Sequence, residues 1–221
     1  MPDLDPDRTL ALSYVSARHR PAVDALWRLD AALGAVVSAG REPLISQIKL
    51  AWWRDSLDKL DRERAPAEPA LEAAARDILP RGVTGAELSA MEEAWTVLLT
   101  PEALSRDDLD SYARSRGGLV FSLSARLLGG TADPAVAKAG ESWALADLAR
   151  HSANAPDRDA AVAAARARVP DHPRRWPGRL RPLGMLAALA RRDAERGGEA
   201  AEPQGSPGRM LRMLGHRFTG R

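Results

Sequence analysis

The chain has no cysteine, and this absence limits the chemistry open to it. Disulfides, thiolate metal sites and a cysteine nucleophile are excluded, so a metal ion would need carboxylates or the four histidines as ligands. Long apolar runs are also missing, since nothing approaches the roughly 18 to 20 apolar residues of a membrane-spanning helix. The N-terminal MPDLDPDR lacks the basic-then-apolar order of a secretory signal. We therefore expect a cytoplasmic protein, with a peripheral position at the inner membrane as one option.

Aromatic residues number ten in 221, and β-branched residues are few. Alternation with a period of two never lasts beyond a handful of positions, so no strand is predicted and the pattern favours an all-α bundle. The aromatics are not interleaved with the basic residues. The basic residues therefore have no aromatic side chains among them to stack on nucleic-acid bases, and we expect no nucleic-acid partner.

Capping residues, prolines and glycines predict where the helices begin and end. Two capping boxes occur, Thr84 with Glu87 and Ser105 with Asp108. The predicted helices cover residues 7–18, 21–37, 43–64, 71–79, 84–100, 105–129, 134–152, an Ala-rich stretch capped by Asp157, 180–196 and 208–218. We divide the chain into a helical bundle (1–197), a flexible linker (198–207) and a basic amphipathic helix (208–221).

Lysine is scarce, with three residues against 29 arginines, and the charge is unevenly distributed. From residue 162 onward there are 13 arginines and five acidic residues, a net charge of +8, which leaves −6 for the first 161. In the last helix one side carries apolar residues and the other carries Arg209, Arg212 and His216; the apolar ones are Met210, Leu211, Leu214 and Phe218. Such a helix docks on an anionic membrane, on a partner protein or back on its own bundle.

The stretch KLAWWRDSLDKL (49–60) combines paired tryptophans with aspartates. At 100° per residue, an apolar arc forms that predicts a core face, made of Ile45, Ile48, Leu50, Trp52, Trp53, Leu57 and Leu60. Asp55, Asp58 and Asp61 lie outside it among basic residues, which is typical of a solvated face. Lys49 falls in the middle of the arc with Ser56 beside it, so it snorkels, pairs with a buried acid or faces a cavity.

Several segments resemble the squalene/phytoene synthase family in the family's own order. They are RPAVDALWRLDAALG (20–34), PLISQIKLAWWRDSL (43–57), SYARSRGGLVFSLSARLLGG (111–130), LRPLGMLAALARR (180–192) and GSPGRMLRMLGHRFTGR (205–221). The resemblance implies an all-helical bundle of the isoprenoid synthase type with a central cavity. It also implies head-to-head joining of prenyl diphosphates, in which Mg²⁺ is held by two facing aspartate-rich motifs.

The two aspartate-rich motifs are not present in this sequence. Where the first belongs, the chain reads DAALGAVVSAGREP, and apart from Asp30 no carboxylate occurs before Glu42. Where the second belongs, Asp147 and His151 share a helix face, but the expected aspartate pair is absent. Small apolar residues, among them Ala31 and Ala35, replace the acids. This pattern resembles the branch of the family that includes a mitochondrial respiratory complex I assembly factor.

From the helix geometry and the matched positions we select ligand-binding candidates and assign neither a catalytic nor a metal-ligating role. The candidates are Lys49, Trp53, Ser56, Tyr112, Gly118, Asp147 and His151. By resemblance Tyr112 stabilises carbocations; otherwise it is a packing residue. Gly117 and Gly118 either kink their helix or admit another backbone.

The function we expect is isoprenoid or lipid binding, or assembly of a membrane (respiratory) complex, with prenyl transfer lost and no cofactor. The alternative is an active, Mg²⁺-dependent prenyltransferase of squalene/phytoene biosynthesis.

Overall fold

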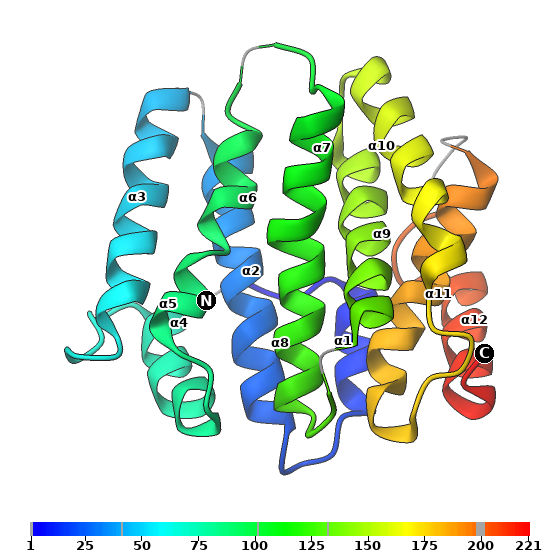
Figure 1. Ribbon diagram of the computed structural model, residues 1–221, viewed down its shortest axis with the longest axis horizontal. Helices are drawn as coiled ribbons and strands as arrows, with labels where there is room; N and C mark the ends of the chain where they lie inside the picture. The colour runs from blue at the N-terminus through cyan, green and yellow to red at the C-terminus, as the bar shows by residue number, and fades with distance from the viewer. Residues whose placement is uncertain (1, 41, 101, 132, 198–201) are drawn as a thin grey trace.

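The computed structural model describes residues 2–40, 42–100, 102–131, 133–197 and 202–221. Every regular element in these ranges is helical, which confirms the all-α prediction. The α-helices are α1 (Pro6–Ser13), α2 (Arg20–Ala39), α3 (Pro43–Lys59), α4 (Pro69–Ala73), α5 (Gly85–Ser89), α6 (Glu92–Val97), α7 (Arg106–Tyr112), α8 (Leu119–Leu127), α9 (Pro134–His151), α10 (Ala155–Arg168), α11 (Arg181–Arg196) and α12 (Pro207–Thr219). Figure 1 shows the long helices side by side, with α3 at one end of the row and α12 at the other.

Shorter helical turns extend or link these helices. Two are π-helical, η1 (Ala74–Ile78) and η3 (Ala113–Gly118), and three are 3₁₀-helical, η2 (Leu79–Arg81), η4 (Val169–Asp171) and η5 (Gly178–Leu180). Among the helices of the described ranges, none has the length and apolar character needed to cross a bilayer.

The helix starts follow from local chemistry. Proline occupies one of the first two positions of α2, α3, α9, α11 and α12, where its missing N–H leaves no bond unmade. Both predicted capping boxes form, at the starts of α5 and α7. Other boundaries were predicted too long: α1 ends at Ser13, α3 ends at Lys59, and the helix predicted over 84–100 is divided into α5 and α6.

A close backbone contact joins the middle of the bundle. Helices α7 and α8 are continuous through η3, and η3 packs against α9. A Cβ atom on Gly117 would lie 2.1 Å from the carbonyl oxygen of Gly140, and a Cβ on Gly140 would lie 2.1 Å from the oxygen of Gly117. Because only hydrogen fits there, Gly117 and Gly140 allow the two helix backbones to touch. Of the two roles predicted for Gly117, a kink in its helix or the close approach of another backbone, the structure shows the close approach.

Helix α3 corrects the prediction for KLAWWRDSLDKL. It buries Leu50, Trp53 and Leu57, but Ile45, Ile48 and Trp52 are exposed, with Trp52 at 46%. The reason is position: α3 lies at the edge of the row and packs against α2, α5 and α6, so only part of its broad apolar arc is covered. On the predicted solvated face, ion pairs form between Arg54 and Asp55 and between Asp58 and Arg62.

The C-terminal segment packs on the bundle. Residues 198–201 of the predicted linker lie outside the described residues, but from Glu202 onward the chain makes specific contacts. The N–H of Gly205 donates to Asp7, and the guanidinium of Arg209 bonds Asp7 and Asp193 at 2.8 to 2.9 Å. Helix α12 therefore lies against α11 and α1 as part of the bundle.

Candidate functional site

A cavity of about 500 Å³ opens beside α2, between the N-terminal segment, α6, α7 and α9. Small or apolar side chains form much of its wall. These are Ala31, Gly34, Ala35 and Val37 from α2, with Leu98 after α6 and Leu148 on α9. Polar groups gather on the remaining surface, among them Asp5, Arg8, Tyr112, Arg116, Asp147 and His151. The cavity is thus largely apolar with a few convergent polar groups, as ligand sites commonly are.

Arg116 is the centre of the polar surface. It lies in the π-helical segment η3, four residues after Tyr112, and its side chain is only 2% exposed. Nε and Nη2 donate to the two carboxylate oxygens of Asp30, each at 3.0 Å. Nη1 donates to Oδ2 of Asp147 at 2.7 Å and to the hydroxyl oxygen of Tyr112. One guanidinium therefore joins α2, α7 and α9 through charge-assisted hydrogen bonds.

Aromatic rings enclose this guanidinium. Its carbon lies 4.4 Å from the ring centroid of Trp95 and 4.8 Å from that of Trp143, and Tyr112 is 5.7 Å away. Such cation–π contacts are strongest when water is excluded, as it is here. The rings also fix the orientation of Arg116, which leaves it few alternative partners.

A second arginine continues the network toward the N-terminus. Nη1 of Arg8 donates to Oδ2 of Asp30 at 3.0 Å, and Nε bonds Asp5. At the other end, Nδ1 of the exposed His151 lies 3.4 Å from Oδ1 of Asp147. The chain of contacts Asp5, Arg8, Asp30, Arg116 and Asp147 alternates in charge, so each buried charge has an opposite neighbour, as burial requires.

The pKa shifts follow from burial opposed by charge. Burial alone would lower the pKa of Arg116, but the carboxylates of Asp30 and Asp147 outweigh it and raise that pKa well above its usual value. Burial would raise the pKa of Asp147, yet the positive charge of Arg116, with His151 and Arg8, holds it below its usual value. For Tyr112 burial dominates and raises the pKa, so the phenol stays protonated. Near neutral pH Arg116 is therefore positively charged, Asp147 is negatively charged and Tyr112 is neutral.

These residues do not fit a Mg²⁺ diphosphate. Magnesium prefers carboxylate oxygens in an octahedral shell, and several carboxylates must face a common space to hold it. Asp30 and Asp147 instead share Arg116, whose guanidinium occupies the position between them. Within the described part of the chain, no three His, Asp or Glu side chains are grouped so that they could hold a metal ion.

The structure divides the predicted ligand-binding residues into two groups. Tyr112, Asp147 and His151 line the cavity together. The others do not: Lys49 is exposed on α3, Trp53 and Ser56 are buried elsewhere on that helix, and Gly118 is buried against α9. Of the three environments predicted for Lys49, which were snorkelling to solvent, pairing with a buried acid and facing a cavity, the structure shows the first. The side of α3 that Lys49 occupies is uncovered.

Arg116, Arg8, Asp30 and Trp95 are site residues that the sequence interpretation did not identify. The signal available for Arg116 is its i, i+4 spacing from Tyr112, which places both on one helix face. In a chain with 29 arginines this spacing does not separate one buried arginine from exposed ones. Asp30 is 86 residues from Arg116, and nothing local indicates that pairing.

The family model described as squalene/phytoene synthase matches residues 1–170, which include every bundle helix that lines the cavity. No curated protein matches the chain.

Proposed function

Given that the chain belongs to the squalene/phytoene synthase family, we propose that it binds an isoprenoid or a related lipid in its cavity and has lost head-to-head prenyl transfer. The role of the protein is then either to bind lipids or to take part in the assembly of a membrane complex. One observation carries the proposal: the guanidinium of Arg116 bonds both Asp30 and Asp147.

This arrangement removes the means of ionising a diphosphate. Departure of that group requires its charge to be neutralised, and Mg²⁺ clamped by carboxylates is how such sites achieve it. The carboxylate of Asp147 in the cavity wall and the buried carboxylate of Asp30 are already neutralised by arginine. Arg8 and Arg116 are in turn neutralised by those carboxylates, so they do not replace the metal as a diphosphate clamp.

The cavity wall supports an apolar ligand. Its volume of about 500 Å³ lies in the range of small-molecule sites, and the α2 side presents Ala31 and Ala35, which leave room for a chain or ring system. Trp95, whose ring lies against Gly34 of α2, adds an aromatic surface to the wall. The Tyr112 hydroxyl and the rim residue His151 are placed to orient a polar end of the ligand.

The first experiment tests for lost catalysis. Purified protein is incubated with Mg²⁺ and farnesyl or geranylgeranyl diphosphate, and released pyrophosphate is measured. We expect no release above a protein-free blank. Measurable release that depends on protein and Mg²⁺ would establish the alternative, an active prenyltransferase.

The second experiment tests ligand binding through tryptophan fluorescence. Farnesol is titrated into the wild-type protein, and we expect saturable quenching because Trp95 lines the cavity. Ala31→Phe fills part of the cavity and is expected to weaken binding at least tenfold. Ala39→Phe is the matched control, because Ala39 is an exposed residue of the same helix outside the cavity wall. Equal affinities for the two variants would show that farnesol binds elsewhere.

A further inference from the structure

Helix α12 is oriented with its polar side inward. The side that faces α11 and α1 buries Arg209, Met213 and His216. At 100° per residue, these three positions fall within about 60° of one another. The buried salt bridges of Arg209 with Asp7 and Asp193 fix this orientation, since rotating the helix would leave both carboxylates without that partner. Helix α12 therefore packs on its own bundle, and it does so through its polar side.

The opposite side of α12 presents an apolar stripe to solvent. Leu211 is 70% exposed, Phe218 is 75% exposed and Met210 is 40% exposed, and Leu214 lies between them, half-buried. Their spacing of one, four and eight residues places them on one face, opposite the buried one. Burying Arg209 while exposing Leu211 and Phe218 is costly for a helix whose only environment is water, which indicates that the stripe meets another apolar phase.

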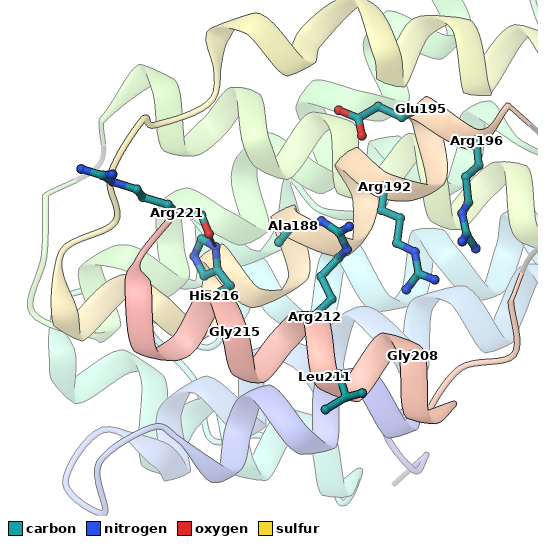
Figure 2. A pocket seen from close by; sticks show the side chains of 10 residues that line it. All are labelled: Ala188, Arg192, Glu195, Arg196, Gly208, Leu211, Arg212, Gly215, His216 and Arg221. Atoms are coloured by element: carbon teal, nitrogen blue, oxygen red, sulfur yellow. Dashed lines mark hydrogen bonds between the residues drawn. The ribbon is translucent and has the colours of Figure 1, made fainter.

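Arginines border this stripe. Between α11 and α12 lies an open groove of about 690 Å³ lined by Arg192, Arg196, Arg212 and Arg221, with Glu195 as the acidic member. Figure 2 shows Arg192 and Arg212 in the space between the two helices, with Leu211 pointing to the other side of α12. Glu202 pairs with Arg192 and Arg196, but Arg212 makes no ion pair within the described residues. Residues 207–221 contain four arginines and no acidic residue.

We propose that α12 docks the protein on an anionic lipid surface, with Leu211, Phe218 and Met210 entering the interfacial region and Arg212 at the level of the phosphates. A solvent-facing apolar stripe bordered by arginine is the arrangement that lies in the plane of a membrane interface. Each arginine near an anionic surface adds attraction that salt screens. The docking surface is separate from the cavity, so the proposal holds whether or not the cavity binds a lipid.

Charge distinguishes this surface from the other exposed apolar stripe. On α3, Leu44, Ile45, Ile48 and Trp52 are also exposed, but that helix carries Asp55 and Asp58 beside its basic residues, whereas residues 207–221 carry arginine and no acidic residue. The two stripes lie at opposite ends of the row of helices. The α3 stripe therefore provides a matched control of similar apolar exposure.

The test is vesicle co-sedimentation of the full chain. Vesicles of phosphatidylcholine alone are compared with vesicles that also contain phosphatidylglycerol, at low and high salt. We expect binding to the anionic vesicles that weakens at high salt. The double variant Leu211→Ser/Phe218→Ser is expected to bind at least tenfold more weakly, because two large apolar side chains no longer enter the interface. Arg212→Glu is expected to weaken binding several-fold.

The matched controls are Leu44→Ser/Ile48→Ser and Arg54→Glu on α3, which are expected to bind like the wild type. Circular dichroism of every variant checks the helical content. No binding of the wild type to anionic vesicles would overturn the proposal, as would equal binding to neutral vesicles or equal loss in the α3 controls. Concentration-dependent self-association that the α12 double variant abolishes, without vesicle binding, would assign the stripe to a second copy of the chain instead.

Discussion

Arg116 connects three helices through charge-assisted hydrogen bonds in the interior. Replacing Arg116 alone therefore changes the free energy of unfolding differently from replacing Arg116 together with its acidic partner. Removing one member of a buried ion pair leaves the other charge without compensation, which typically costs about 3 to 5 kcal/mol, whereas removing both members costs much less. We expect Arg116→Met to lower the free energy of unfolding by about 3 kcal/mol or more, because Asp30 is fully buried and retains only Arg8. Urea denaturation followed by circular dichroism measures this.

A double-mutant cycle gives the control for Arg116. Adding Asp30→Asn to Arg116→Met is expected to recover part of the lost stability, since the unpaired charge is removed. Arg54→Met, which breaks the exposed pair with Asp55, is expected to change stability by less than about 0.5 kcal/mol. Additive effects of the Arg116 and Asp30 substitutions would contradict the proposed coupling.

The titration of His172 is expected to make the free energy of unfolding depend on pH. Burial, and then the nearby charge of Arg191, lower the pKa of His172 to about 4, and its Nε2 lies 2.8 Å from Oγ of Ser142. In the unfolded chain it takes up a proton near pH 6.5, whereas the folded protein binds that proton only near pH 4. Stability contributed by the neutral imidazole is therefore present above pH 6.5 and is lost as the pH falls from 6.5 to 4, by up to about 3 kcal/mol.

The variant His172→Gln removes this titration and retains a hydrogen-bond donor toward Ser142. Urea midpoints for the variant are expected to fall less steeply than those of the wild type between pH 6.5 and pH 4. At pH 7.5, where the wild-type imidazole is neutral in both states, the difference between the two proteins gives the pH-independent effect of the substitution. Parallel curves across the whole range would show that His172 does not cause the acid sensitivity.

The predicted residues that line the candidate cavity are those with a local signal in the sequence. Asp147 and His151 share a face by their spacing of four, and Tyr112 stands in a segment that resembles a family helix. Arg116 and Asp30 lacked such a signal, because a charged residue at a predicted site is read as solvated or ligand-binding until its partner is known. Their pairing depends on how α2 and η3 approach one another, which is decided by tertiary packing.

At the scale of elements, the contact of η3 with α9 requires glycine at one of two adjacent positions. A Cβ on Gly117 would lie 2.1 Å from the backbone oxygen of Gly140, whereas the nearest atom to a Cβ on Gly118 is Cγ of Glu141, at 3.6 Å. We expect Gly117→Ala to cost about 3 kcal/mol, since the helices must separate. Gly118→Ala is expected to be neutral or stabilising by up to about 1 kcal/mol, because alanine favours the helix.

Thermal unfolding of the two alanine variants compares them directly. A lower midpoint for Gly117→Ala and an unchanged or higher midpoint for Gly118→Ala is the expected result. Equal losses would mean that both glycines serve backbone conformation, and that the approach of α9 is not the constraint. Because Arg116 precedes Gly117 directly, separation of η3 from α9 is also expected to weaken the bond between Arg116 and Asp147.

Capping boxes and prolines predicted where most helices begin, because those signals act within one turn. The π-helical turns η1 and η3 were not predicted, since a one-residue expansion of a helix depends on what packs beside it. The exposed side of α3 was also missed. Its apolar pattern is that of a covered face, and only the position of α3 at the end of the row leaves part of that face uncovered.

At the scale of the whole molecule, the two ends of the chain are joined through Arg209. This residue bonds Asp7 on α1 and Asp193 on α11, and the contact with Asp7 spans 202 residues. Asp193 also bonds Arg150, so it keeps a partner if Arg209 is replaced, whereas Asp7 retains, among the described residues, only the N–H of Gly205. Whether α12 unfolds with the bundle or by itself depends on this link.

Arg209→Met is expected to lower the free energy of unfolding by about 3 kcal/mol, because Asp7, 3% exposed, loses its charged partner. Amide hydrogen exchange, read by mass spectrometry of peptides, is expected to rise in α12 and also in α1, which shares the salt bridge. Arg212→Met is the control on the same helix, since its side chain is exposed and makes no ion pair within the described residues. If exchange rose in α12 alone and the bundle kept its stability, the C-terminal helix would be an independently folding appendage, and the fixed orientation of its apolar stripe would lose its support.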